Sequence, residues 1–188
     1  MGASRFYLGT VGPTVHQHAA SVPLRQGAAE LLANLAWGAV PTTLFCSGSG
    51  DVAAQLLTSH GVTGPDGGLP PNLRLVANFF RASPDGAVQG LSSPLVHALN
   101  KNLTTAAALY PGTDFTSKRN CVVIGSSPEA VGCTHGLECE EVLSIGFMKL
   151  TADFMERFPA YLESFDVVVL GDGSLGYVND ILQQVAGR

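Results

Sequence analysis

The stretch Asn120-Cys-Val-Val-Ile-Gly-Ser-Ser-Pro-Glu-Ala-Val-Gly-Cys-Thr-His-Gly136 decides the fold of this chain. Its apolar run Val122-Val123-Ile124 ends at Gly125, which is the pattern of a buried parallel strand followed by a tight turn and a helix start. In α/β sheets, ligands bind at the carboxyl ends of such strands. The stretch therefore predicts an α/β fold and a candidate ligand site directly after Gly125.

The segments on both sides alternate between strand and helix patterns. Strands are expected at residues 5–10, 40–45, 73–78, 121–124, 141–147 and 166–170, with helices at 27–37, 51–60, 97–107, 151–163 and 175–185. Residues 79–90 carry a turn signal and predict a hairpin. This alternation indicates a doubly wound, mostly parallel sheet. We expect one core domain over residues 1–188, with 1–23 as a divergent N-terminal strand and loop.

Several end signals accompany these elements. Asp51 and Thr151 are expected to cap the helices that follow them, as is Ser174 for the last helix. Gly61 is expected just beyond the C-terminus of the helix at 51–60. The histidines His16 and His18 are expected to face solvent in the N-terminal loop.

The composition and net charge bear on whether the chain binds other proteins, nucleic acid or a membrane. Hydrophobic residues make up 46% of the chain and charged residues 13%, about half the usual charged share of a soluble domain. Part of the surface is therefore expected to be buried against other protein subunits. The net charge of -5 and the lack of a basic run argue against direct nucleic-acid binding. No apolar stretch reaches bilayer length, so we expect no transmembrane helix.

The N-terminus and the cysteines bear on the compartment. No secretory signal pattern is present, so a cytoplasmic location is expected. The first 29 residues carry Arg5 and Arg25 but no acid, which leaves a mitochondrial location as the alternative. The four cysteines show neither CxxC spacing nor a disulfide framework, which fits a reducing compartment. Cys133-Thr-His135 with Cys139 lacks standard zinc spacing and is expected to pack or lie exposed.

From Leu24 nearly to the C-terminus, spaced blocks match a known family. They are Leu24-Arg-Gln-Gly27, Val40-Pro41 with Phe45, Gly48-Ser-Gly-Asp-Val52, Asn78, Asp85-Gly86, Gln89-Gly90, Leu95-Val-His-Ala-Leu-Asn-Lys-Asn102, Gly125 with Ser127, Gly136, Ile145-Gly-Phe147, and Asp166, Asp172, Leu175 and Asn179. In these blocks the chain resembles the eukaryotic pyrimidine 5′-nucleotidases (cytosolic 5′-nucleotidase type III) of the haloacid dehalogenase superfamily. The resemblance implies a Rossmann-like core with a helical cap, and Mg²⁺-dependent hydrolysis of nucleoside monophosphates through an aspartyl-phosphate.

The residues that this chemistry needs are largely replaced. The family's two aspartates on the nucleophile strand have their best counterparts at Tyr7 and Gly9, and no room for a helical cap remains before Leu24. The phosphate-binding serine falls at Cys46, and the motif lysine is kept as Lys101. The two metal-holding aspartates fall at the positions of the pair Ser126 and Ala130.

Mg²⁺ prefers oxygen ligands that include one or two carboxylates, and loss of the nucleophile removes the covalent route. The resemblance therefore predicts a degenerate, capless and catalytically inactive member that needs no cofactor and serves as a structural or interaction subunit. A Mg²⁺-dependent pyrimidine nucleoside monophosphate 5′-nucleotidase with displaced acids such as Glu129 or Asp172 is the alternative. Weak phosphate or nucleotide binding remains open, with Cys46, Ser47, Gly48 and Lys101 as candidate contacts.

Overall fold

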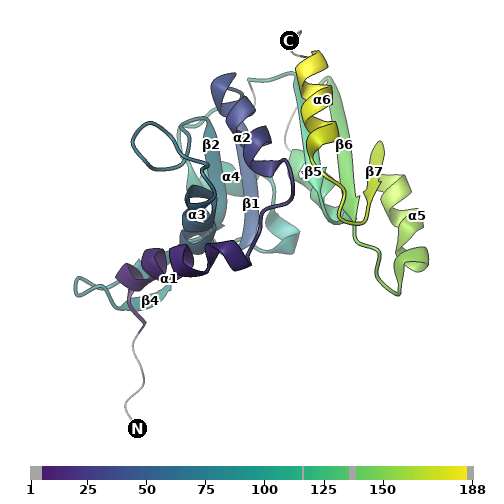
Figure 1. Cartoon of the computed structure of the whole chain (residues 1–188). Helices are drawn as coiled ribbons and strands as arrows, with labels where there is room; N and C mark the ends of the chain where they lie inside the picture. The colour runs from purple at the N-terminus through teal and green to yellow at the C-terminus, as the bar shows by residue number, and fades with distance from the viewer. Residues whose placement is uncertain (1–5, 116, 136–138, 186–188) are drawn as a thin grey trace. The chain divides into compact units, whose positions relative to one another are not determined.

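The computed structural model describes residues 6–115, 117–135 and 139–185 (Figure 1). The chain divides into two compact units. One comprises residues 1–96 and 174–188, and the other residues 97–173. The expectation of one domain over residues 1–188 stays a prediction.

The first unit is built from both ends of the chain. Its elements are η1 (Leu8–Thr10), α1 (Val11–His18), η2 (Ala19–Ser21), α2 (Ala28–Trp37), β1 (Thr42–Ser49), α3 (Gly50–Ser59), β2 (Leu73–Asn78), β3 (Phe80–Ala82), β4 (Val88–Leu91) and α6 (Gly176–Val185). Strands β1 and β2 pair in parallel, from Thr42 opposite Leu73 to Phe45 opposite Val76. Strands β3 and β4 form the antiparallel hairpin that the turn signal predicts.

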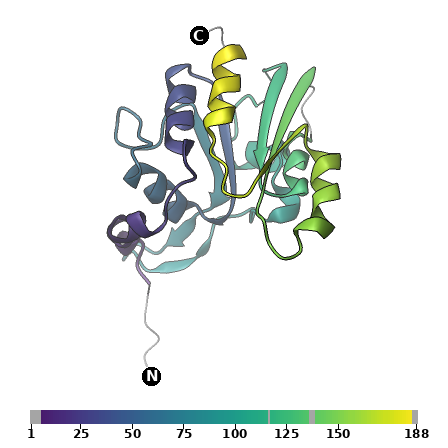
Figure 2. The same ribbon diagram turned by 45° about the vertical axis from the view of Figure 1, so that its right-hand side comes forward.

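The core of this unit lies under α3 and β2. Leu57, Val62 and Leu73 are buried there, and partly buried apolar side chains from α2, β1 and the connecting loops pack against them. In Figure 2, α6 lies beside α2. The two helices are joined at their beginnings, because the backbone N–H of Leu175 donates to the carbonyl of Gln26 at 2.9 Å. The last helix therefore belongs to the unit formed by the first half of the chain.

The second unit is a parallel three-stranded sheet with helices. Its elements are η3 (Ala98–Asn100), α4 (Leu103–Leu109), β5 (Asn120–Gly125), η4 (Pro128–Thr134), β6 (Glu141–Met148), α5 (Phe154–Ser164) and β7 (Val167–Leu170). The strand order is β5-β6-β7, all parallel, and α5 lies beside this sheet in Figure 1. Met148, Tyr161 and Phe165 form its buried cluster.

The fold is α/β with mostly parallel strands, as the sequence predicts. Among the described residues, the parallel strands fall into two sheets, β1-β2 and β5-β6-β7. Within the same residues, no helix is long and apolar enough to cross a membrane. The predicted strands at 73–78, 121–124, 141–147 and 166–170 all form, with boundaries within one residue of those expected.

The N-terminal prediction is wrong in its secondary structure. Tyr7 makes a single antiparallel bridge to Ala87 instead of lying in a strand, and residues 8–10 are a turn of 3-10 helix. The expected loop is the helix α1. A helix is possible because Pro13 lies in the first turn, where its missing N–H removes no helical hydrogen bond. Packing of α1 along α3 then stabilises it.

Two of the predicted helix caps are also wrong. Ser49, not Asp51, caps α3, since its side-chain oxygen accepts from the N–H of Val52 at 3.3 Å. Helix α5 begins after Asp153, to which the Thr151 hydroxyl donates a hydrogen bond. The predictions at the last helix and at Gly61 are confirmed: Ser174 accepts from Gly176, and Gly61 has a φ of 83°.

Strand β5 is less buried than its apolar run predicts. Val123 is 3% exposed, whereas Val122 and Ile124 are 38% and 41% exposed. Val122 and Ile124 point to the face opposite that of Val123, so only the face that carries Val123 is well covered. A continuous apolar run does not by itself distinguish an edge strand from a central one.

Candidate functional site

The last residues of β1 hold three of the candidate phosphate contacts. Residues 46–49 continue β1, and the pairing with β2 is irregular between Phe45 and Ser49. Ser47 and Gly48 are exposed and Cys46 is half-buried. Gly50 is buried and begins α3, and a Cβ there would stand 2.7 Å from the Phe79 ring. Glycine is therefore required where this segment enters the helix.

Asn78 fixes this segment from the neighbouring strand. It ends β2, is 6% exposed, and donates from its amide to the carbonyls of Ser47 at 2.9 Å and Val96 at 2.8 Å. Its side-chain oxygen accepts from the N–H of Val96 at 2.7 Å. All of its hydrogen-bonding groups are engaged, so Asn78 positions backbone and has no free group for a ligand.

Asp51 has a similar positioning role. Its carboxylate accepts from the backbone N–H of Phe80 at 2.7 Å, which ties the first turn of α3 to the start of the hairpin. A negative charge at this end of a helix is favourable because the first backbone N–H groups carry partial positive charge. Phosphate binding at residues 46–50, which this partial charge would favour, stays a prediction, and the Asp51 carboxylate lies beside the segment.

Lys101 belongs to the other unit. It follows η3, at whose start His97 and Asn100 form a reciprocal capping arrangement, and it precedes Asn102, which caps α4 by accepting from Thr105 at 3.1 Å. Lys101 therefore lies in a different unit from Cys46, Ser47 and Gly48. Its role as a phosphate contact stays a prediction.

The carboxyl end of β5 shows what stands in place of the family's metal-holding aspartates. Ser126 is exposed, and its carbonyl accepts from the Tyr161 hydroxyl at 2.7 Å. The Ala130 side chain packs against the buried cluster of α5 and β6. A Cβ on Gly125 would lie 2.2 Å from the Cβ of Ala130. Position 130 therefore faces apolar side chains and the end of β5.

Glu129 is the nearest acid to this end of β5. It is exposed, and a hydrogen bond from Ser127 lowers the pKa of its carboxyl group below the ordinary value, with a smaller contribution from the positive charge of Arg157. Asp172 and Asp180 are exposed on other segments. Among the described residues, no three or more His, Cys, Asp or Glu side chains come together in a way that could hold a metal ion. The residues present do not fit the Mg²⁺ site that the family resemblance implies.

Tyr7 and Gly9 were expected on the nucleophile strand. Tyr7 pairs with Ala87 through a single bridge, its carbonyl accepts from the backbone N–H and the hydroxyl of Thr10, and Gly9 lies in η1. The assignment of these residues to the aspartate positions thus loses the strand on which it depended.

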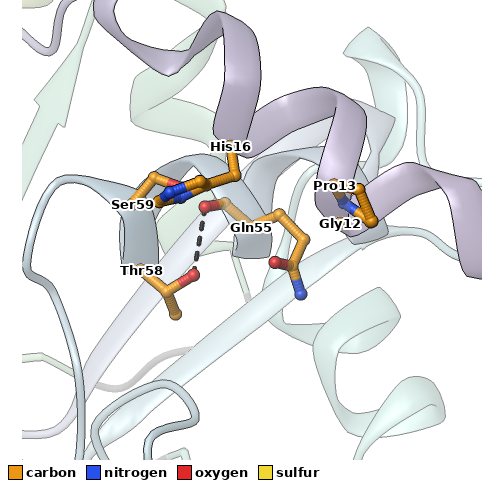
Figure 3. Close-up of a pocket in the computed structure, with 6 residues that line it drawn as sticks. All are labelled: Gly12, Pro13, His16, Gln55, Thr58 and Ser59. Atoms are coloured by element: carbon orange, nitrogen blue, oxygen red, sulfur yellow. Dashed lines mark hydrogen bonds between the residues drawn. The ribbon is translucent and has the colours of Figure 1, made fainter.

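The hollow between α1 and α3 is lined by residues that do not form a recognisable catalytic group. Figure 3 shows its lining by Gly12, Pro13, His16, Gln55, Thr58 and Ser59. It measures about 500 Å³. The Ser59 hydroxyl oxygen lies 3.5 Å from Nδ1 of His16. His16 lies on a helix and not in the expected loop. No acid, lysine or arginine is among these lining residues, and none of the predicted site residues borders the hollow.

Comparison with known proteins identifies the family. The family model of pyrimidine 5′-nucleotidase (UMPH-1) matches residues 11–186, which is nearly the whole chain. The chain belongs to the pyrimidine 5′-nucleotidase (UMPH-1) family. This confirms the resemblance that the spaced blocks indicate.

The individual relatives that match this chain share a low sequence identity with it. The 7-methylguanosine phosphate-specific 5′-nucleotidases of Rattus norvegicus and Homo sapiens are each 27% identical over 163 residues, covering 86% of this chain and 52% of the relative. That of Gallus gallus is 28% identical over 165 residues, covering 87% and 54%. The chain thus spans about half the length of the curated relatives it matches.

A solved structure shows the same fold. The crystal structure of cytosolic 5′-nucleotidase IIIB bound to cytidine has a TM-score of 0.79 at 21% identity, covering 98% of this chain and 59% of that chain. The chain therefore has the Rossmann-like fold of the haloacid dehalogenase type. The sequence did not predict the roles of Asn78 and Tyr161. Asn78 appears there only as one of the residues that match the family, and nothing in the sequence marks Tyr161 as the hydrogen-bond donor to the Ser126 carbonyl.

Proposed function

We propose that this chain is a catalytically inactive member of the 5′-nucleotidase family that acts as a structural or interaction subunit of a larger protein assembly. The observation that carries the proposal is the pair of residues at the carboxyl end of β5. Ser126 offers a hydroxyl and Ala130 a methyl group packed on apolar side chains, where the family resemblance implies two carboxylates.

The energetic argument concerns the metal and the nucleophile. Mg²⁺ keeps several waters and is usually bound through one or two carboxylates, which Ser126 and Ala130 do not supply. A general acid or base is worth about 10²–10⁴ in rate, and Tyr7 and Gly9, the counterparts that the resemblance gives for the two strand aspartates, carry no carboxylate. One lysine and the glycine-containing end of β1 do not make up for this loss. We therefore assign the chain no cofactor.

An interaction role is supported by the surface of the second unit. Met155 and Leu162 on α5 are 74% and 57% exposed, and Leu150 before that helix is 62% exposed. With a charged share of only 13%, such side chains favour burial against another protein. The cytoplasmic location and its mitochondrial alternative both stay predictions.

The second candidate is a Mg²⁺-dependent nucleoside monophosphate 5′-nucleotidase. Family membership favours it, as do the names of the relatives, which are nucleotidases. In this candidate, Lys101 neutralises phosphate and acids such as Glu129 or Asp172 replace the missing ones. Binding of phosphate or nucleotide at residues 46–50 without turnover would be a separate, non-hydrolysing function.

A phosphatase assay separates the two candidates. The purified chain is incubated with CMP, UMP or 7-methylguanosine monophosphate, with and without Mg²⁺, and phosphate release is measured. We expect no Mg²⁺-dependent release. Turnover that is lost in Lys101→Ala and kept in Lys118→Ala, a control lysine of the same unit, would establish the enzyme and contradict our proposal.

The subunit role needs its own test. The endogenous protein is recovered under native conditions, sized, and its companions identified by mass spectrometry. Recovery in a stoichiometric complex is the expected result. Recovery as a free small protein would contradict the subunit role, whatever the outcome of the assay.

A further inference from the structure

Helix α5 of the second unit carries exposed apolar side chains along one line. Met155 and Leu162 are 74% and 57% exposed, and Pro159 between them is also exposed. The spacing of four and then three residues places these side chains on one face of the helix, over about 10 Å of its length. Met155, Pro159 and Leu162 are called the α5 stripe below.

The α5 stripe is separate from the face of the helix that packs against the sheet. Phe154 and Phe158 pack against the buried cluster that includes Tyr161 and Phe165. At 100° per residue, the α5 stripe lies roughly a quarter of a turn away from the middle of this packed face. A surface helix ordinarily carries polar residues outside its packed face. The α5 stripe is therefore apolar surface that the packing of α5 on its own unit does not use.

Acidic side chains border the α5 stripe. Glu156 and Glu163 are exposed, and the helical angle places both on the side of the stripe that is away from the packed face. Arg157 lies further round the helix, where its guanidinium is 3.8 Å from the Asp153 carboxylate and donates to the Tyr161 hydroxyl. The charge of Arg157 is thus met by an acid of the same helix. The border next to the stripe is negative.

The negative border decides between the occupants that an apolar stripe could take. Anionic membrane surfaces attract basic segments, so Glu156 and Glu163 disfavour a membrane. A second copy of the chain would bring another acidic border into the same contact, which like charges disfavour. A helix with an apolar face flanked by Lys or Arg matches both the stripe and its border.

We propose that the α5 stripe docks a basic amphipathic helix of another protein subunit. The proposal rests on the subunit role proposed above and names the surface and the kind of partner. The apolar side chains supply most of the affinity, since they lose their exposed area in the contact. Glu156 and Glu163 supply the preference for a basic partner, and this part weakens as salt screens the charges.

Two synthetic helical peptides of about 15 residues serve as probes. One has Leu at positions i, i+3, i+4 and i+7 and Lys at most other positions, and the other has Glu in place of each Lys. Binding of each fluorescently labelled peptide to the full chain is measured by anisotropy at low and high salt. We expect the Lys peptide to bind, more weakly at high salt, and the Glu peptide not to bind.

Apolar variants test whether the Lys peptide binds at the α5 stripe. Met155→Ala and Leu162→Ala are each expected to weaken its binding roughly tenfold, because each removes apolar area that the contact buries. Leu99→Ala is the control, since Leu99 is 86% exposed in the same unit and should leave the affinity unchanged. Circular dichroism verifies that each variant is folded.

Charge variants separate the acidic border from the net charge of -5. Glu156→Lys and Glu163→Lys are each expected to weaken binding of the Lys peptide several-fold at low salt. Glu30→Lys makes the same change of net charge at an exposed position of the first unit, and its affinity should stay within about twofold of the wild type. An equal effect of all three variants would mean that only net charge is read, and would overturn the proposal.

The remaining outcomes distinguish this proposal from the subunit role. Failure of the Lys peptide to bind, equal binding of the Glu peptide, or full affinity in the stripe variants would overturn the docking proposal. In native recovery of tagged protein, the double variant Met155→Ala with Leu162→Ala should be lost from the complex that holds the wild type. A double variant that stays in that complex overturns the docking proposal and leaves the subunit role intact. Wild type recovered free contradicts the subunit role itself.

Discussion

Asp166 shows how a single carboxylate holds two neighbouring strands in register. It immediately precedes β7 and accepts from the backbone N–H of Ser144 at 2.8 Å and from its hydroxyl at 2.7 Å. The Ser144 oxygen in turn accepts from the N–H of Asp166 at 3.0 Å. The hydrogen bond from the Ser144 backbone, followed by that from its hydroxyl, lowers the pKa of the Asp166 carboxyl group. Asp166 is a structural acid and not a ligand.

This lowered pKa predicts a pH dependence of stability. Because the folded state favours the ionised form, Asp166 stabilises the fold above the ordinary carboxyl pKa, and this contribution disappears as the pH falls through the lowered value. Urea unfolding of wild type and Asp166→Asn is compared between pH 7 and pH 3. We expect the wild type to be more stable at pH 7 and the difference to shrink toward pH 3. A difference that grows at acid pH would contradict the sign.

At the scale of elements, helix α5 supports the loop that follows β5. Tyr161 is 1% exposed, and its hydroxyl donates to the carbonyl of Ser126 and accepts from Arg157 at 3.2 Å. Its ring lies 5.8 Å from that of Phe165. The helix thereby fixes the backbone at the position where the family resemblance implies a metal ligand.

Replacement of Tyr161 by Phe measures this support. The ring packing is kept, but the Ser126 carbonyl loses its donor, which should lower the free energy of unfolding by about 1–2 kcal/mol. Leu162→Ala, one residue further and 57% exposed, is the control and should change stability by less than about 0.5 kcal/mol. Urea unfolding followed by circular dichroism gives both values. Equal effects of the two variants would show that the hydroxyl contributes nothing.

At the scale of the whole molecule, the chain closes its first unit with its last helix. Val178 and Asn179 of α6 are 0% and 4% exposed. The Asn179 amide donates to the carbonyl of Gly27, and its oxygen accepts from Asn34, both at 3.4 Å. More than 140 residues separate these partners in the sequence, so α6 folds onto a unit formed far upstream.

Asn179→Ala tests this closure. Loss of two long hydrogen bonds from a buried side chain should lower the free energy of unfolding by about 1–3 kcal/mol, partly because the Asn34 amide then loses this acceptor. The neighbouring Asp180→Ala, at an exposed position, is the matched control and should be near neutral. Thermal unfolding of the full chain is the measurement. A neutral Asn179→Ala would mean that α6 is held by its apolar side chains alone.

The sequence by itself determined the family and the strands at 73–78, 121–124, 141–147 and 166–170. It misplaced the first strand, which runs from Thr42 to Ser49, and it merged η3 and α4 into one helix. Apolar runs such as Val122-Val123-Ile124, and glycines such as Gly61 whose backbone has φ > 0, are local signals that survive in any tertiary setting. The loss of carboxylates at Ser126 and Ala130 is likewise readable without a structure, because it depends only on which residue types follow β5.

Only the tertiary structure decided the features that depend on packing partners. Helix α1 forms where Gly12 and Pro13 suggested a loop, since its contact with α3 outweighs local propensity. Ser49 caps α3 by accepting from the N–H of Val52. The Asp51 carboxylate instead accepts from the backbone N–H of Phe80 in the hairpin. Such pairings join residues far apart in the chain, and no local pattern records them.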